Sequence, residues 1–341
     1  MTAPPRFSVV IPTYQRRESL LRTLALLHRQ TIAPETYEVI VSVDGSTDGT
    51  AEAVRGYAAP YASSVLVQPR RGRARARNAG IRAAVGDVIV LLDDDMEPVP
   101  AFLESHGRAH EIPGTWVVIG AAPIVVSSDS PPFTRYMAAG FEARLERLGQ
   151  PGFRLGFRDA YTGNLSCRRD VLLAVGGFDE AFRVYGHEDY ELALRLQDAG
   201  AELTYSAGAL AHQHYDKTFR AFARDGIARG RTAVLFAGKH PAVVDRLKLS
   251  EYRQGDWRWR ALRGLLLRLG RLTDRVPEWV VEVVERLERR APARLDKYYT
   301  LAIDYLYWYG AFGALRERRS DPLAGPMARG VRPASPDVRG P

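Results

Sequence analysis

Three consecutive aspartates, Asp93 to Asp95, are the residues of this chain best suited to chemistry. They directly follow Val88–Leu92, an apolar run that predicts a strand buried on both faces. Two acids separated by one residue suit a hydrated divalent cation, which prefers hard oxygen ligands. Ligands of open α/β sheets also collect beyond the carboxyl ends of the strands. A solvated acidic turn is the alternative explanation of this run.

A second acidic pair, Glu188 and Asp189, opens a predicted helix. The pair could simply complement the helix dipole. It could also supply a general base, which requires a carboxylate near an acceptor hydroxyl. Further along the chain, His212 and His214 are separated by one residue. They are ordinary surface or core residues, or one of them completes a metal site.

A basic segment covers residues 70–78 between a predicted strand and a predicted helix. Arg73 and Arg77 are four residues apart, so they share one helix face. Arginines at a helix start could bind a diphosphate. A solvated basic face is the alternative. No aromatic residues interleave with the arginines, which disfavours RNA stacking.

The elements that must position these residues alternate along the first hundred residues. Apolar β-rich runs predict strands at 7–12, 37–43, 64–67 and 88–92, with helices at 16–30 and 73–84. This order predicts an α/β fold with a parallel, doubly wound sheet. Polar residues end each of three strands and converge at one edge, as in a nucleotide pocket: Thr13 and Tyr14, then Asp44, then the aspartates at 93–95.

The later elements are less regular. Thr47 is expected to cap the helix after the second strand. Residues 115–120, 124–126 and 203–205 predict strands, residues 169–175 predict a helix, and residues 131–158 are expected to form an insertion over the site.

Composition narrows the class of protein. The chain has 341 residues, 46% of them hydrophobic and 26% charged, which indicates one large globular domain or slightly more. Its one cysteine, Cys167, excludes an internal disulfide framework and suits a reducing compartment. The net charge is +8, but acids are interspersed with the basic residues, which weakens a nucleic-acid role. No signal pattern or run of about 20 apolar residues is visible. We therefore expect a cytoplasmic protein, either free or at the inner face of a membrane.

Taken together, these motifs resemble those of family-2 glycosyltransferases, which have the nucleotide-sugar-binding GT-A fold. The resemblance covers about residues 7–218 and, more loosely, continues to 241. The motifs that carry it are VVIPTY at 9–14, VDGSTDGT at 43–50, ARNAG at 76–80, LDDD at 92–95, GGFD at 176–179 and YGHED at 185–189. Two positions depart from the family pattern, Val43 in place of an acid and Gln15 in place of an asparagine. They bear on the nucleotide's identity more than on the reaction.

The resemblance implies a role for each candidate residue. The nucleotide-sugar would contact Pro12, Thr13, Tyr14, Asp44, Arg77, Asp93 and Asp94, with Asp44 accepting from the base and Arg77 near the pyrophosphate. Asp93 and Asp95 fill the Asp-x-Asp positions, where Asp95 would ligate Mn²⁺ or Mg²⁺ directly and Asp93 would face the ribose or the metal. A spacer that packs or caps is the alternative role of Asp94. His212 would complete the metal shell, with His214 as the alternative.

The implied reaction is a metal-dependent, inverting single displacement. Asp189 would deprotonate the acceptor hydroxyl, and Glu188 would position the acceptor or the base. The donor would carry UDP in the first place, or GDP or dTDP. The acceptor would be a glycan, a lipid-linked glycan or a small molecule, as in polysaccharide or cell-envelope biosynthesis, and no nucleic-acid partner is expected.

Two other functions fit parts of this pattern. A sugar-phosphate nucleotidyltransferase also uses a doubly wound sheet and acidic metal ligands, but residues 12–16 lack the glycine-rich loop that it needs. A nucleotide-sugar-binding protein without catalysis is disfavoured because the acids and His212 are all present.

The C-terminal third is helical in pattern. Residues 257–276 predict an amphipathic basic helix, which either packs on the protein or a partner subunit or lies on an anionic membrane. The aromatic residues at 298–309 fit a homodimer surface, a sugar-stacking surface or a core. We expect a nucleotide-sugar-binding half at 1–100, an acceptor-binding and catalytic half at 101–242, a helical region at 243–320 and a disordered tail at 321–341.

Overall fold

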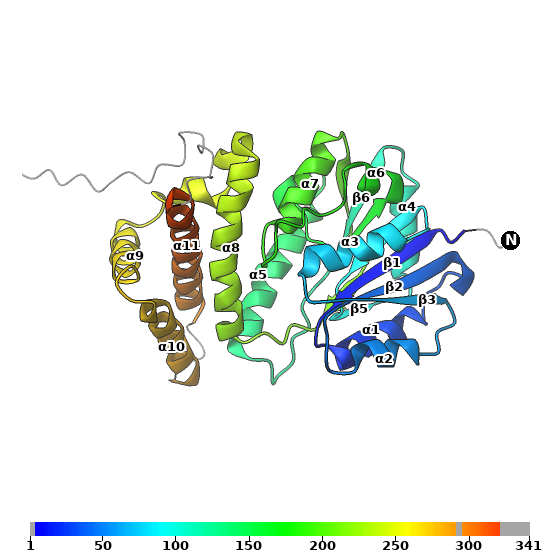
Figure 1. Cartoon of the computed structure of the whole chain (residues 1–341), viewed down its shortest axis with the longest axis horizontal. Coiled ribbons are helices and arrows are strands. Elements are labelled where there is room, and N and C mark those ends of the chain that lie inside the picture. The colour runs from blue at the N-terminus through cyan, green and yellow to red at the C-terminus, as the bar shows by residue number, and fades with distance from the viewer. Residues whose placement is uncertain (1–3, 291–294, 321–341) are drawn as a thin grey trace, which may run out of the picture. The chain divides into compact units, whose positions relative to one another are not determined.

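The structure is a computed structural model that describes residues 4–290 and 295–320 (Figure 1). It divides into two compact units. The first comprises Met1–Val184 and Glu188–Asp216, and the second comprises Tyr185–His187 and Lys217–Pro341. The expected tail at 321–341 lies outside the described residues, and the expected domain bounds stay a prediction.

A seven-stranded sheet forms the centre of the first unit. Its strand order is β3-β2-β1-β4-β7-β6-β8, and the pairs from β3 to β4 are parallel, as the sequence predicts. Every residue of β1 and β4 is buried, as expected for strands covered on both faces. The strands are β1 (Phe7–Thr13), β2 (Tyr37–Asp44), β3 (Ala62–Gln68), β4 (Val88–Leu92), β6 (Thr115–Gly120), β7 (Asn164–Arg168) and β8 (Glu202–Ser206).

One antiparallel strand brings a distant segment to the functional edge. β7 pairs with β4 so that Asn164 lies opposite Leu92. The start of β7 therefore lies where β4 ends, beside the acidic run. A small two-stranded sheet of β5 (Met96–Pro98) and β9 (Ala211–Gln213) adds the segment that carries the two histidines to the same region.

Helices cover both faces of this sheet, with α3 on one face of β1 to β3 and α1 and α2 on the other (Figure 1). The helices of this unit are α1 (Arg17–Leu27), α2 (Thr50–Arg55), α3 (Arg73–Ala83), α4 (Phe102–His110), α5 (Pro132–Leu148), α6 (Arg169–Ala174) and α7 (Glu188–Asp198), with 3₁₀ turns at Pro34–Thr36 and Phe157–Asp159.

Three local predictions differ from the structure. The N-cap of α2 is Gly49 rather than Thr47, and Asp48 accepts a hydrogen bond from the Thr50 backbone N–H. Residues 124–126 form an isolated bridge at Ile124 instead of a strand. The segment expected as an insertion contains the helix α5, whose start follows Pro131.

The second unit is helical. It contains α8 (Phe219–Lys239), α9 (Trp257–Leu269), α10 (Arg275–Arg290) and α11 (Asp296–Ser320), with 3₁₀ turns at Pro241–Arg246 and Lys248–Glu251. α8 and α11 cross closely at two glycines, because a Cβ on Gly230 would lie 1.9 Å from the Tyr307 carbonyl oxygen and one on Gly310 would lie 2.0 Å from the Ile227 carbonyl oxygen. The predicted aromatic cluster is mostly core, since Tyr299, Tyr305, Tyr307 and Trp308 are buried.

Among the described helices, none combines the length and the apolar character that crossing a bilayer requires.

A buried polar chain connects α4 to β7. His106 is fully buried, with Nε2 3.0 Å from Asn164 Oδ1 and Nδ1 2.8 Å from Ser166 Oγ. Asn164 in turn donates to the carbonyl oxygens of Ala121 and Ala209. Burial, and secondarily the charge of His110, lowers the pKa of His106 to about 3, against the opposing effect of the hydrogen bond that His106 donates to Asn164 Oδ1. His106 is therefore neutral in the folded protein over the physiological range.

This burial predicts an acid-sensitive stability. The unfolded chain binds a proton on His106 below about pH 6.5 and the folded chain does not, so the free energy of unfolding falls by about 1.4 kcal/mol per pH unit as the pH decreases towards 3. In His106→Gln, the free energy of unfolding should depend less steeply on pH, because this contribution is lost. The variant should also be less stable than the wild type at neutral pH. Urea unfolding between about pH 6 and pH 5 measures it. The exposed control His28→Gln should keep the wild-type slope, and an unchanged slope in His106→Gln would contradict the assignment.

Candidate active site

The ends of β1 and β2 form the part of the site expected to contact a nucleoside. Asp44 is buried and accepts hydrogen bonds from Gln68 Nε2 at 2.7 Å, from the Arg71 backbone N–H at 2.8 Å and from the Gly72 backbone N–H at 2.9 Å. The carboxylate thus fixes the loop that leads into α3. Its predicted role in accepting from a base stays a prediction.

Tyr14 and Gln15 line the same end of the sheet. Pro12 and Thr13 are buried, whereas Tyr14 is exposed and has the Arg70 guanidinium 4.2 Å from its ring centre. Gln15 has a φ of 54° and exchanges two hydrogen bonds with Thr47. The glutamine that stands here in place of asparagine therefore holds the turn after β2 through these two hydrogen bonds.

The acidic run begins beside β7. The Asp93 backbone N–H donates to the Gly163 carbonyl at 3.0 Å, and a Cβ on Gly163 would lie 3.0 Å from Asp93 Oδ2. Asp94 is buried next to Thr13. Burial and the charge of Asp95 raise the pKa of Asp94 to about 7, against the opposing effects of Arg16 and Thr13. Asp94 is thus turned into the protein, and its direct contact with a donor stays a prediction.

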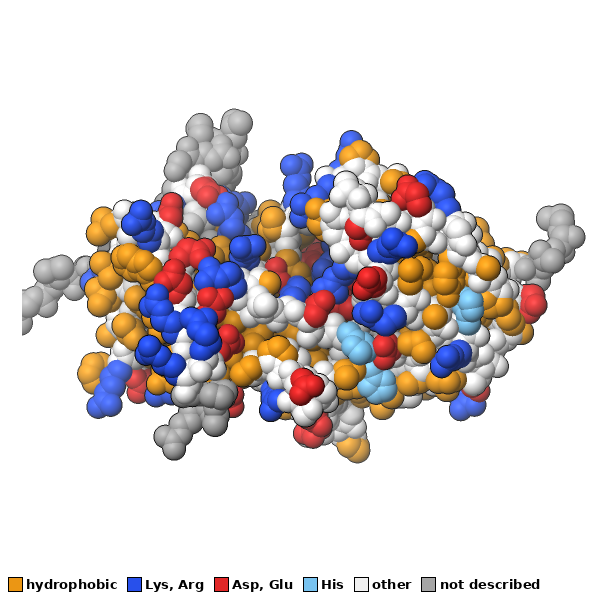
Figure 2. All heavy atoms as spheres, turned by 90° about the horizontal axis from the view of Figure 1, so that it is seen from below, with side chains coloured by type: hydrophobic (Ala, Val, Ile, Leu, Met, Phe, Trp, Pro, Cys, Tyr) orange, Lys and Arg blue, Asp and Glu red, His pale blue; other side chains and the backbone are white. Residues whose placement is uncertain are grey.

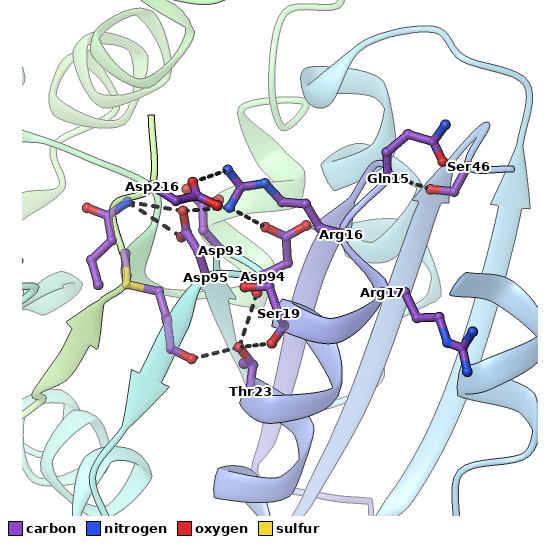
Figure 3. Close-up of polar contacts among 12 residues, drawn as sticks. Gln15, Arg16, Arg17, Ser19, Thr23, Ser46, Asp93, Asp94, Asp95 and Asp216 are labelled. Atoms are coloured by element: carbon purple, nitrogen blue, oxygen red, sulfur yellow. Dashed lines mark hydrogen bonds and ion pairs between the residues drawn. The ribbon is translucent and has the colours of Figure 1, made fainter. Parts of the chain in front are cut away.

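Arg16 is the basic partner of this run (Figure 3). Its guanidinium lies 3.1 Å from Asp95 Oδ2 and 3.0 Å from Asp216 Oδ1, with Asp94 at 3.9 Å. Burial and the charge of Asp93 raise the pKa of Asp95, while Arg16, Arg73 and Gln213 lower it. The negative charges of Asp93 and Asp95 therefore lie close enough to repel each other, and the positive charge of Arg16 offsets part of this repulsion.

The two histidines lie on and just after β9. His212 is paired with Glu97 across the small sheet, and His214 Nε2 lies 2.7 Å from Glu97 Oε1. Between them, Gln213 Nε2 points to Asp95 at 3.5 Å. Within residues 4–290 and 295–320, no group of three or more His, Cys, Asp or Glu side chains is arranged to hold a metal ion. Ligation by His212 or His214 accordingly stays a prediction.

Arg77 joins the acidic run to the second acidic pair. Its side chain is 1% exposed, and its guanidinium lies 2.8 Å from Asp93 Oδ1, 3.5 Å from Asp189 Oδ1 and 4.0 Å from Glu188 Oε1. The Phe178 ring covers it at 5.2 Å. Arg77 is therefore an internal counter-ion of three carboxylates, in addition to its predicted place near a pyrophosphate.

Asp189 has a second fixed partner. The Thr162 hydroxyl donates to Asp189 Oδ1, and the Thr162 backbone N–H donates to Oδ2 at 3.3 Å. The neighbouring Glu188 is buried. Burial and the charge of Asp189 raise the pKa of Glu188, against the charges of Arg73 and Arg77. The carboxylate of Asp189 is thus oriented from two sides.

A reciprocal pair of hydrogen bonds places α3. Asn78 Nδ2 donates to the Phe178 carbonyl at 2.9 Å, and the Phe178 backbone N–H donates to Asn78 Oδ1 at 2.8 Å. The ARNAG and GGFD motifs, far apart in the sequence, therefore form one structural unit that sets the position of Arg77.

Sequence reasoning brought the acids and Arg77 together but missed four partners. Arg16, Thr162 and Gln213 each contact a candidate carboxylate, and Asp216 contacts Arg16. Their residue types are common in loops, and only Arg16, in the loop that follows the first predicted strand, carried a positional signal.

Comparisons with known proteins match the part of the chain that carries these residues. The model of glycosyl transferase family 2 matches residues 8–176, and the model described as the N-terminal domain of galactosyltransferase matches residues 144–218. The first match covers the strand ends and the acidic run, and the second covers the Glu188–Asp189 pair. The chain belongs to glycosyl transferase family 2.

Curated relatives match part of the chain. Validoxylamine A glucosyltransferase of Streptomyces hygroscopicus subsp. limoneus is 35% identical over 226 residues, which cover 59% of this chain and 50% of the relative. Pre-mycofactocin glycosyltransferase of Mycobacterium tuberculosis (strain ATCC 25618 / H37Rv) is 30% identical over 276 residues, which cover 79% of this chain and 55% of the relative. The chain thus spans about half the length of these relatives.

Solved structures show the same fold. The mannosyltransferase PcManGT from Pyrobaculum calidifontis, in complex with GDP-Man and Mn²⁺, has a TM-score of 0.56 at 19% identity and covers 90% of this chain and 88% of its own. S. aureus TarS 1-349 in complex with UDP-GlcNAc has a TM-score of 0.52 at 14% identity and covers 95% of both chains. The predicted GT-A fold is confirmed.

The position of Arg77 predicts a non-additive mutational effect. Arg77→Ala leaves buried carboxylates without their counter-ion and should reduce the free energy of unfolding by about 3–5 kcal/mol. Asp93→Asn in the Arg77→Ala background should restore about 1–2 kcal/mol, because it removes one of the mutually repelling charges.

Urea unfolding of the wild type, both single variants and the double variant measures this coupling. Arg82→Ala, an exposed position of the same helix, is the matched control and should change stability by less than about 0.5 kcal/mol. Additive effects of the two substitutions would show that Arg77 acts through packing on Phe178 alone.

Proposed function

We propose that this chain is a metal-dependent glycosyltransferase that moves a sugar from a nucleoside-diphosphate sugar to a hydroxyl group with inversion of the anomeric centre. The observation that carries the proposal is the shared counter-ion. Arg77 contacts Asp93 on the donor side and Asp189 on the side of the proposed base. A single displacement needs both groups close together, because the acceptor attacks as the donor bond breaks.

Asp189 is the proposed general base. Thr162 and Arg77 orient its carboxylate, and its side chain remains 27% exposed, so an acceptor hydroxyl can approach it. An alcohol has a very high pKa, so the carboxylate takes the proton as the new bond forms rather than beforehand. Glu188, buried next to Asp189, positions this base.

The donor is proposed to bind at the ends of β1, β2 and β4. Pro12, Thr13, Tyr14 and Asp44 would form the nucleoside side, and Arg77 would lie near the pyrophosphate. Arg73, whose charge lowers the pKa of both Asp95 and Glu188, is proposed as a second arginine for the diphosphate. Two structural neighbours were solved with GDP-Man and with UDP-GlcNAc. We propose UDP as the donor nucleotide, with GDP or dTDP as the alternatives.

The residues at the acidic run fit a divalent cation. Asp93 and Asp95 offer hard oxygen atoms, and their mutual repulsion is relieved by positive charge. We propose that Asp95 binds Mn²⁺ or Mg²⁺ directly, with Asp93 and with His212 or His214 as further ligands. When bound, the cation supplies positive charge that stabilises the diphosphate leaving group. Mn²⁺ accompanies the donor in the PcManGT structure.

The acceptor is proposed only as a hydroxyl compound: a glycan, a lipid-linked glycan or a small molecule. The relatives are named after different acceptors or products, among them validoxylamine A, pre-mycofactocin and chondroitin. We propose cell-envelope or polysaccharide biosynthesis as the setting of the reaction.

The base assignment is tested by Asp189→Asn, once thermal shift with UDP-, GDP- and dTDP-sugars has identified a donor. The amide still accepts from Thr162 but cannot take a proton, so turnover should fall by about 10²–10⁴-fold while donor affinity changes by less than about threefold. Asp198→Asn, at the exposed end of the same helix, is the matched control and should keep wild-type turnover. Full turnover by Asp189→Asn would contradict the assignment of Asp189 as the general base. Failure of the wild-type chain to bind any of these donors would contradict the proposed glycosyltransferase function.

The ion pair between Arg16 and Asp95 leads to a prediction about Mn²⁺ affinity in the absence of substrate. Its guanidinium lies on the proposed metal ligand Asp95, so a divalent cation must displace it. Arg16→Ala should bind Mn²⁺ about 3–10-fold more tightly, a change on the scale of one part-buried ion pair.

Titration of free Mn²⁺ by electron paramagnetic resonance measures this affinity in the absence of nucleotide. Arg17→Ala is the matched control, because Arg17 points away from the carboxylates in Figure 3. Weaker or unchanged Mn²⁺ binding by Arg16→Ala would show that the two cations do not compete.

A further inference from the structure

The outer face of α9 is both apolar and basic. Trp257, Leu262, Leu265, Leu269 and Leu272 are 65%, 47%, 51%, 41% and 83% exposed, respectively. Large hydrophobic side chains at such exposure are unusual in this number on one short stretch, and contiguous exposed apolar surface marks interaction sites. We define this surface, residues 257–272 of the second unit, as the α9 face.

The orientation of α9 is fixed from its inner side. Asp304 of α11 accepts from Trp259 Nε1 at 2.9 Å and from Arg263 at 2.7 Å, and Arg263 is 3% exposed. Leu267, one turn further, is also buried. Because positions 259, 263 and 267 point inward, positions 257, 261, 265 and 269 point to the opposite side. The exposure of Leu265 and Leu269 therefore follows from a specific buried ion pair.

The charge of this segment has one sign. Residues 257–273 contain five arginines and no acid. Arg258, Arg260, Arg268 and Arg271 are exposed, and none of the four is paired with a carboxylate in the part of the chain that the structure describes. The neighbouring acids of α10 are engaged elsewhere, because Glu278 and Glu285 pair with Arg220 of α8. Figure 2 shows hydrophobic side chains beside basic ones on the helical unit, at the left of the view, with acidic side chains among the basic ones.

The exposed leucines and arginines of the α9 face distinguish between three possible partners: a second copy of the chain, a nucleic acid and an anionic lipid surface. A second copy meeting this face across a twofold axis would bring arginines against arginines with no acid between them, which is unfavourable. A nucleic acid would neutralise the arginines but would leave the leucines in water. An anionic lipid surface satisfies both, since leucine and tryptophan enter the interface while arginine side chains extend to the phosphates.

We infer that the α9 face docks on a membrane surface that contains anionic phospholipid. The helix has 13 residues and is thus about 20 Å long, so it lies in the interface plane and does not span the hydrocarbon core of about 30 Å. The inference concerns a surface of the helical unit and is independent of the proposed transfer reaction.

Sedimentation with phospholipid vesicles tests this inference. The full chain should sediment with vesicles of phosphatidylcholine mixed with phosphatidylglycerol, should bind pure phosphatidylcholine vesicles much more weakly, and should be released by salt. Arg258→Gln/Arg268→Gln should reduce partitioning by about 10–30-fold, since each basic residue near an anionic surface contributes roughly fivefold. Leu265→Ser/Leu269→Ser should reduce it by at least about tenfold through lost apolar burial.

The matched control is Arg29→Gln/Ile112→Ser, which changes an exposed arginine and an exposed isoleucine of the first unit. It should bind vesicles as the wild type does, and thermal unfolding should show that all variants remain folded. Failure of the wild type to sediment with anionic vesicles would overturn the inference. So would equal binding by the leucine variant, tighter binding to an oligonucleotide than to vesicles, or a dimer by light scattering that Leu265→Ser/Leu269→Ser dissociates.

Discussion

A buried guanidinium that needs carboxylates is the constraint on which this site depends. Arg77 is the largest side chain among those that are almost completely buried, and a charge removed from water costs several kcal/mol unless it is paired. Asp93, Asp189 and Glu188 provide that pairing from two separate segments. The proposed donor side and the proposed base are therefore held together by the same electrostatic requirement, before any substrate binds.

The sheet supplies the geometry that makes this pairing possible. β4 is parallel to β1 and antiparallel to β7, so the end of one strand meets the start of the other at Asp93 and Gly163. Thr162 precedes this point and contacts Asp189. A shift of the β4–β7 register by one residue would turn every side chain of β7 to the other face and separate these groups.

Much of this arrangement could be predicted from the sequence, for reasons that are local. The strand order follows from alternating apolar runs, and Asp93, Asp189 and Arg77 lie in motifs whose spacing is recognisable. What could not be predicted depends on contacts between distant segments: Arg16 with Asp216, Thr162 with Asp189, and Gln213 rather than a histidine directed at Asp95. The exposure of the leucines on α9 likewise depends on Asp304, about forty residues away.

We propose that Asp93, Asp95 and Asp189 belong to one site that receives a nucleoside diphosphate and its cation. A crystal structure of the chain soaked with Mn²⁺ and UDP, recorded with anomalous scattering from manganese, tests it most directly. We expect one manganese peak next to Asp95, Arg16 displaced from that carboxylate, and Arg77 still between Asp93 and Asp189. A nucleotide bound elsewhere, with Arg16 still on Asp95, would contradict it.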